Sequence, residues 1–221
     1  MEYDLEQYDP KVSKSLSPEP HRFFEYTLNN DLDSLVKELL VRYDQIANKE
    51  IAGVTDVTEK DIFLDSNSVS TIKWSQYNVF QFNIPGVRSL FSAVSKMVQE
   101  ASEYYNKNFE DQQYMVQGWF NVNYTKNGKL PWHDHSPQGA PLFHGYYSVS
   151  AEPSETHYFA NGDHKVNHNV NNKAIMSEMG HSHAMGEWDW EGPRITIAYD
   201  IVPLSYLIEN EVEEQHWIPL N

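Results

Sequence analysis

The spacing of apolar residues changes near residue 110, and this change limits the folds open to the chain. Before it, apolar residues recur at three- and four-residue steps, which predicts amphipathic helices over 31–48 and 86–106. Asn30 or Asp31 can cap the first helix. After it, apolar and polar residues alternate, as in half-buried strands. Over 114–124, one face would carry Tyr114, Val116, Phe120, Val122 and Tyr124, and the other Gln117, Asn121 and Asn123.

Further strands are predicted at 129–135, 144–151, 155–160, 165–169, 173–178 and 194–202, with turn residues between them. Many short strands that follow helices favour a β-sandwich or jelly roll with helical support, in a mainly β, α+β chain. We expect four segments along the chain. They are a flexible tail (1–22), helical and strand support of the same domain (23–110), the β core (111–206) and a C-terminal segment (207–221).

Charge and composition exclude several classes of protein. The 221 residues carry 32 acidic against 16 basic side chains, for a net charge of −16. Such a surface repels phosphate backbones, so nucleic acids and anionic membranes are not expected partners. The absence of Cys excludes thiolate nucleophiles, zinc–thiolate sites and iron–sulfur clusters. The N-terminus shows no signal-peptide pattern, and no apolar run approaches the ~20 residues of a membrane span, so we expect a soluble cytoplasmic protein.

Histidines are concentrated in the predicted β core. The pairs His133-x-His135 and His181-x-His183 lie about 50 residues apart, and alternate residues of a strand point to the same face. Two such pairs can therefore aim several imidazoles into one metal site. The remaining histidines of this region are open between further ligands, neighbours of a site and ordinary core or loop residues; they are His144, His157, His164 and His168.

A strand near the C-terminus offers a carboxylate-binding pair. Arg194 and Thr196 share one face of the segment 194–202, and the other face carries the apolar residues Ile195, Ile197, Tyr199 and Ile201. A guanidinium supplies a bidentate fork for a carboxylate, and the hydroxyl adds one donor. The alternative is an arginine on an edge strand that faces solvent.

Four short segments resemble the 2-oxoglutarate- and Fe(II)-dependent oxygenases. More narrowly, they resemble members of that superfamily that are widespread in bacteria and in phages of marine cyanobacteria. The segments are Trp119 to Tyr124, Trp132 to His135, His144 to Tyr147 and Pro193 to Asp200. They follow the family's order and gaps, with His183 eleven residues before Arg194. The resemblance implies a double-stranded β-helix, the cupin-like form of the jelly roll, for the β core.

The resemblance also implies a metal site. His133 and His183 match the two iron-binding histidines of the family, while His135 stands where the family usually has Asp. A three-histidine site carries one negative charge less. We expect His135 rather than Asp134 to complete it, because Asp134 would point away unless the strand has ended or bulged.

For the cosubstrate, the resemblance implies that Arg194 binds the distal carboxylate of 2-oxoglutarate with Thr196 as its helper. Tyr124 and Tyr147 stand where members of the superfamily place further cosubstrate contacts. Residues that could support the site from nearby are Asn121, Asn123, Asp134 and His181.

The implied activity couples decarboxylation of 2-oxoglutarate, to succinate and CO2, with hydroxylation of an unreactive C–H bond. The implied cofactors are Fe(II), 2-oxoglutarate as cosubstrate and ascorbate as a candidate reductant. The primary substrate is open between a protein side chain, a small metabolite and a modified nucleobase, the last being disfavoured by the net charge. If the gene belongs to a phage, the protein would work in the host cytoplasm.

Two other classes of function fit parts of the pattern. A metal protein without oxygenase activity would use His133, His135, His181 and His183 as a closed four-histidine zinc site. A jelly roll is also a common architecture for structural and binding modules, since a fold does not fix a function.

Overall fold

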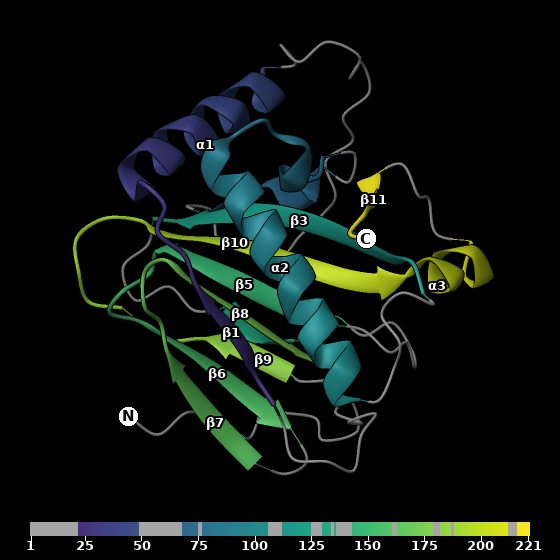
Figure 1. Cartoon of the computed structure of the whole chain (residues 1–221). Helices are drawn as coiled ribbons and strands as arrows, with labels where there is room; N and C mark the ends of the chain where they lie inside the picture. Colours follow the sequence, from purple (N-terminus) through teal and green to yellow (C-terminus); the bar gives the residue numbers. More distant parts are fainter. Residues whose placement is uncertain are drawn as a thin grey trace.

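A computed structural model describes two antiparallel sheets, with helices that cover the larger one (Figure 1). The described residues are 22–48, 68–74, 77–105, 112–124, 130–133, 135, 143–160, 163–178, 182–186, 188–211 and 216–221. Before the β core lie β1 (Phe24–Thr27), α1 (Leu32–Ala47), β2 (Ser68–Ser70), the 3-10 helices η2 (Thr71–Lys73) and η3 (Val79–Gln81), and α2 (Pro85–Tyr104). The strands that follow are β3 (Tyr114–Asn123), β4 (Leu130–His133), β5 (Phe143–Ser150), β6 (Glu155–Ala160), β7 (Asp163–His168), β8 (Lys173–Glu178), β9 (Ser182–Met185) and β10 (Arg194–Pro203). The chain closes with α3 (Leu204–Glu209) and β11 (Ile218–Pro219).

Both predicted helices form, for the local reasons that the sequence suggests. The side chain of Asp31 caps α1 by accepting a hydrogen bond from the backbone N–H of Ser34 at 3.2 Å. Helix α2 begins at Pro85, where the missing N–H costs no helical hydrogen bond. The apolar stripes of both helices pack against one face of the larger sheet. In Figure 1, α2 lies across that face. The two helices therefore serve as scaffold.

The larger sheet runs in the order β1-β8-β5-β10-β3-β11, with β2 also paired to β3. The smaller sheet runs β4-β9-β6-β7. All of the strand pairs are antiparallel. The predicted mainly β fold with few helices is thus confirmed, and the arrangement is compatible with a jelly roll.

Strand β10 lies inside the larger sheet, between β5 and β3, and is buried on both faces. Ile195, Ile197, Tyr199 and Ile201 face the helices and belong to the main hydrophobic core. Arg194, Thr196, Ala198 and Asp200 occupy the opposite face, which we call the inner face. The predicted alternation along this strand is confirmed, and the alternative of an edge-strand arginine in solvent is wrong because Arg194 is only 5% exposed.

The inner face of the larger sheet meets the smaller sheet. Tyr158 of β6 packs there with Trp119, Tyr146, Ile175 and Ala198, which all come from the larger sheet. Side chains on these two facing surfaces are therefore brought together from segments far apart in the sequence. Five of the site candidates from the sequence lie on these surfaces: His133, His135, His183, Arg194 and Thr196.

Three features differ from the sequence-based expectation or fall outside it. A short strand, β9, carries His183, whereas no strand was predicted there. Helix α3 crosses the expected boundary between the β core and the C-terminal segment, and the C-terminal segment also contains a short strand, β11. Of the predicted tail, only Arg22 belongs to the described residues, and its guanidinium lies 4.5 Å from the ring centroid of Tyr104. Among the described helices, none combines the length and the apolar character needed to cross a membrane.

Candidate metal centre

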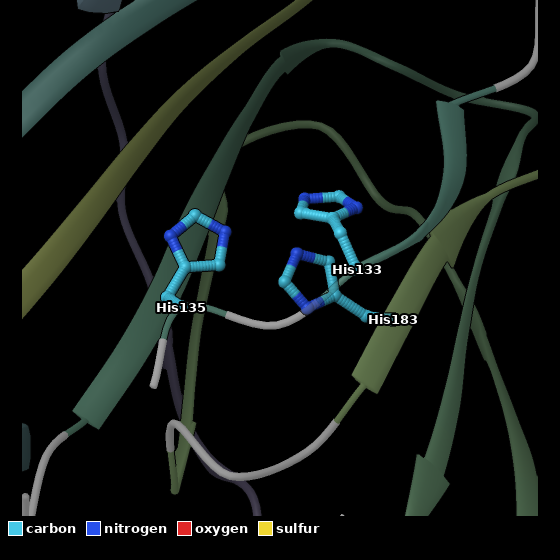
Figure 2. Close-up of side chains that lie close together, drawn as sticks. All are labelled: His133, His135 and His183. Atoms are coloured by element: carbon cyan, nitrogen blue, oxygen red, sulfur yellow. The ribbon is translucent and has the colours of Figure 1, made fainter. Parts of the chain in front are cut away.

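Three imidazoles gather where β4 ends beside β9 (Figure 2). His133, His135 and His183 each offer a ring nitrogen, and these three nitrogens all lie within 4.8 Å of one another. The ring centroid of His133 lies 4.3 Å from that of His183 and 5.2 Å from that of His135, and the His135–His183 separation is 5.1 Å. One ion can reach donors at these separations with modest side-chain adjustment, since imidazole nitrogens bind first-row metals at about 2.0–2.1 Å.

Strand pairing explains why two of these rings meet. His133 and His183 are directly opposite partners in the antiparallel β4–β9 pair, so their side chains project from the same face. His135 follows two residues later, just past the end of β4, and its ring lies with the other two. Asp134 and His181 lie outside the described residues. The structure thus brings the ring of His135 together with those of His133 and His183.

A carboxylate from the larger sheet holds the His135 ring. Nδ1 of His135 lies 3.1 Å from Oδ2 of Asp200, and the other oxygen of Asp200 lies 2.7 Å from Nδ1 of His144. Trp119 stacks on His135, with a centroid distance of 5.6 Å and an interplanar angle of 18°. Nε2 of His135 is buried and has no hydrogen-bond partner among the described residues. A buried ring nitrogen left without a partner fits a metal-binding role.

The charges around this carboxylate are set by burial and by its two histidines. Burial alone would raise the pKa of Asp200, but His135 and His144 outweigh it and lower that pKa to about 2. Burial lowers the pKa of His144 to about 4, assisted by the neighbouring His135 and opposed by the hydrogen bond to Asp200. Near neutral pH, Asp200 is thus ionised and His144 is neutral. A carboxylate accepts hydrogen bonds only, so both Nδ1 atoms act as donors to it.

Arg194 is a buried cation on the inner face. Its Nε donates to Oγ of Ser154 at 3.2 Å, and no carboxylate of the described residues is paired with it. Burial lowers its pKa to about 10, while Tyr146 and Tyr158 act to raise it, so the guanidinium remains charged at neutral pH. An unpaired buried charge is costly. The position is therefore suited to binding an anionic ligand.

Polar side chains surround Arg194 on the inner face. Thr196 is 4% exposed and lies opposite Asn121 of β3 and Ser148 of β5 in the sheet register. Oγ of Ser148 is buried without a hydrogen-bond partner among the described residues. Asn123 lies directly opposite Arg194, and Asn121 accepts a hydrogen bond from Ser70 at 2.5 Å. Asn121 and Asn123 thus lie on the same face as Arg194 and Thr196.

The two tyrosines proposed from the resemblance lie elsewhere. Tyr147 faces the helices, opposite Ile197, and its hydroxyl donates to Asn172 at 2.5 Å. Tyr124 follows the end of β3 and is 50% exposed. The structure does not bring either ring to the inner face with Arg194. Tyr146, the neighbour of Tyr147, does lie there.

Two residues of this centre were not singled out from the sequence as site residues. His144 was left open among several roles, and Asp200 was noted only as the end of a similar segment. Alternation along the strand could have placed Asp200, which lies six residues after Arg194 on the same face. His144 is its direct partner across the β10–β5 pair, and only the register of that pair reveals this.

The remaining histidines of the β core form a separate group on the other face of the smaller sheet, which we call the outer face. Nδ1 of His157 lies 3.0 Å from Nε2 of His164, and Nδ1 of His168 lies 3.1 Å from Oε1 of Glu155. Among the described residues, these three histidines and Glu155 belong to no group of three ligands that could share a metal.

Two tryptophans follow the distal histidine in the chain. Trp188 is buried and packs near Trp190, with ring centroids 5.7 Å apart.

Comparisons with known proteins identify the fold. No family model matches the chain. No curated protein matches it either. Among solved structures, a prolyl-4-hydroxylase of Pseudomonas putida is similar at 10% identity and a TM-score of 0.52, over 82% of this chain and 92% of that chain. AviO1 of Streptomyces viridochromogenes Tue57 is similar at 11% identity and a TM-score of 0.51, over 81% of this chain and 89% of that chain.

A third similar structure contains ligands. The epimerase SnoN, in complex with Fe3+, α-ketoglutarate and nogalamycin RO, is 7% identical, with a TM-score of 0.52 over 81% of this chain and 78% of that chain. The resemblance to the 2-oxoglutarate- and Fe(II)-dependent oxygenases is therefore confirmed at the level of the fold. At such low identity these likenesses carry the fold alone, and the roles of the residues in this chain are argued below from their own geometry.

Proposed function

We propose that the protein is a 2-oxoglutarate- and Fe(II)-dependent dioxygenase built on a double-stranded β-helix. The strand order supports this topology. From β3 to β10 the chain alternates between the larger and the smaller sheet, apart from the β6–β7 hairpin, which stays in the smaller one. In the larger sheet these strands lie in the order β3-β10-β5-β8, and in the smaller sheet in the order β4-β9-β6-β7. Two four-stranded antiparallel layers therefore face each other, as in a double-stranded β-helix.

In this proposal His133, His135 and His183 hold the iron. The donor set suits Fe(II), since imidazole is a common ligand of this ion, and three protein ligands leave positions open for other groups. The orphaned Nε2 of His135 is the structural observation that favours a bound ion. When bound, iron with 2-oxoglutarate would activate O2 for hydroxylation of a C–H bond, with one oxygen atom entering the substrate and the other entering succinate as CO2 is released.

In the same proposal, Arg194 and Thr196 bind the distal carboxylate of 2-oxoglutarate. A buried guanidinium gains charge-assisted hydrogen bonds when a carboxylate binds it, and these bonds are the strong ones in a site that excludes water. Ser148, whose hydroxyl is buried and unpartnered among the described residues, is a further donor to this ligand. Tyr146 and Tyr158 would wall the cosubstrate site, because both are buried near Arg194.

One observation carries the proposal: three convergent imidazoles and a buried, unpaired arginine lie on the facing surfaces of two sheets. Tyr158 lies near both groups: its ring centroid is 5.7 Å from that of His183, and Tyr158 also acts to raise the pKa of Arg194. 2-Oxoglutarate needs two neighbouring positive groups, one at each end. The iron would bind one end, and Arg194 would bind the distal carboxylate.

Turnover of the cosubstrate tests the proposal without knowledge of the primary substrate. The purified protein is supplied with Fe(II), 2-oxoglutarate, ascorbate and O2, and the release of succinate is measured. We expect metal-dependent succinate formation in the wild type and none in the His133→Ala variant. If the isolated protein contains tightly bound zinc with four nitrogen ligands and releases no succinate, it is a closed metal-binding protein and the proposal is wrong.

A further inference from the structure

We propose that Asp200 is a positioning residue of the metal centre, which fixes His135 as the Nδ1–H tautomer and turns its Nε2 toward the ion. This inference rests on the proposed function, because it assigns the three imidazoles to one metal. In this inference Asp200 is not a ligand of the ion, although its carboxylate forms a second group of three possible ligands with His135 and His144. Asp200 acts through His135, to which it is hydrogen-bonded at 3.1 Å.

The position of His135 in the chain explains why such a partner is needed. His133 and His183 are fixed by strand pairing, whereas His135 lies beyond the last residue of β4. Backbone pairing therefore does not orient its ring. Asp200 lies within β10, which is hydrogen-bonded to β3 and β5 on its two sides, so it presents its carboxylate from a rigid base.

The carboxylate is itself held at both oxygens. Oδ1 of Asp200 lies 2.7 Å from Nδ1 of His144, and Oδ2 lies 3.1 Å from Nδ1 of His135. The rings of His135 and His144 are stacked, with centroids 3.9 Å apart and an interplanar angle of 21°. His144 thus keeps the carboxylate plane in place, and the carboxylate keeps the plane of His135 in place.

This arrangement also restores the missing charge. A site of three neutral imidazoles leaves the full double charge of Fe(II) uncompensated by its ligands. A carboxylate hydrogen-bonded to a ligating imidazole makes that imidazole a more basic ligand and places a negative charge close to the ion. Asp200 would therefore supply, through His135, the charge that a directly bound carboxylate would have supplied.

The test uses Co(II), added to the metal-free protein and followed by its visible absorption. We expect Asp200→Asn to weaken Co(II) binding by about 10- to 100-fold, since loss of such partners typically has this effect. Glu155→Gln is the matched control. Glu155 is also a carboxylate paired with two histidines, His157 at 3.4 Å and His168 at 3.1 Å, but on the outer face. This control should bind Co(II) as the wild type does.

A double-mutant cycle separates positioning from a general effect of charge or structure. If Asp200 acts through His135, Asp200→Asn should add less than about a 3-fold loss when His135 is already Ala. In the metal-free protein, side-chain nitrogen NMR should show His135 as the Nδ1–H tautomer in the wild type and should no longer show this tautomer in Asp200→Asn.

A second variant is used if Asp200→Asn does not fold, as judged by the absence of a cooperative unfolding transition. His144→Ala then takes its place, with an expected loss of Co(II) affinity of about 10-fold, at the low end of the same range.

The outcomes distinguish this inference from the proposed function. If the wild type binds Co(II) and Asp200→Asn binds it equally well, or loses as much affinity with and without His135, the inference is wrong and the proposed function stands. If the wild type binds no Co(II), the proposed function fails and this inference fails with it.

Discussion

His133 and His183 are direct cross-strand partners in the β4–β9 pair, and their ring centroids lie 4.3 Å apart. Residues 50 positions apart in the chain are thereby held as neighbours by backbone hydrogen bonds rather than by a loop. A metal site built on paired strands is already organised before the ion arrives. This relationship underlies the first prediction.

Replacing either partner should remove the metal. We expect His183→Ala or His133→Ala to weaken Fe(II) or Co(II) binding by at least about 100-fold, the upper limit seen for residues that merely support ligands. Isothermal titration under anaerobic conditions measures the change. His168→Ala is the control, because His168 lies on the outer face with 78% of its side chain exposed. Equal affinities in His183→Ala and wild type would show that His183 is not a ligand.

Metal binding should stabilise the fold. An ion at a free concentration of 100 times its Kd adds about 2.7 kcal/mol to the free energy of unfolding, because it binds only the folded state. For a chain of this size the melting temperature should rise by about 5–10 °C. Differential scanning calorimetry with and without a chelator measures this shift. The shift should be absent in His133→Ala, and its persistence there would place the bound ion elsewhere.

Loss of the buried guanidinium should affect the cosubstrate and not the metal. Arg194→Met keeps much of the side-chain volume but removes charge-assisted hydrogen bonds of about 1.5–3 kcal/mol each. We expect 2-oxoglutarate binding to the Fe(II) protein to weaken by about 10- to 100-fold or more, with unchanged Fe(II) affinity. Arg88→Met, on the exposed face of α2, is the control. Unchanged 2-oxoglutarate affinity in Arg194→Met would contradict the assignment of this arginine.

Tyr147 should contribute to stability and not to the cosubstrate site. Its hydroxyl is buried on the helix side of β5, where it donates to Asn172 and accepts from Asn30 at 2.9 Å. We expect Tyr147→Phe to lose about 1–2 kcal/mol of unfolding free energy at neutral pH, in urea denaturation, because two half-buried partners, Asn30 and Asn172, lose a hydrogen bond. Affinity for 2-oxoglutarate should be unchanged. A large loss of that affinity would return Tyr147 to the cosubstrate site.

The same tyrosine predicts an alkaline dependence of stability. Burial raises the pKa of Tyr147 to about 12, although the hydrogen bond from Asn30 opposes this, whereas the unfolded value is about 10. The neutral phenol is thus favoured in the folded state. Its contribution is present below about pH 10 and is lost as the pH rises from about 10 to about 12, for a total of about 3 kcal/mol. Between pH 8 and 11 the wild type should therefore lose about 1.4 kcal/mol more than Tyr147→Phe. Parallel curves for the two proteins would contradict the assigned burial.

Much of the fold could be predicted because its patterns are local. The cap at Asp31, the stripe on α2 and the alternation in β10 each depend on residues a few positions apart. Strand β9 escaped prediction because it has only four residues, all of them buried, so it has no alternation to detect. Such short buried strands are defined by their partners rather than by their own sequence.

The parts of the site that depend on register could not be predicted in this way. Tyr146 and Tyr147 are adjacent in a strand buried on both faces, so the sequence does not say which ring faces the inner side. The hydrogen bond between His135 and Asp200 joins residues 65 positions apart. Only the pairing of the sheets brings these two together. By contrast, Arg194 and Thr196 could be assigned to one face because both lie on one regular strand.

Anaerobic titration of the wild-type protein, first with Fe(II) and then with 2-oxoglutarate, tests the central claim most directly. If one ion held by three imidazoles keeps room for a chelating cosubstrate, a weak visible charge-transfer band should grow with 2-oxoglutarate and saturate at one equivalent. The band should be lost in His183→Ala and should require much more cosubstrate in Arg194→Met. A protein that binds Fe(II) but shows no band at any concentration of 2-oxoglutarate would contradict the account.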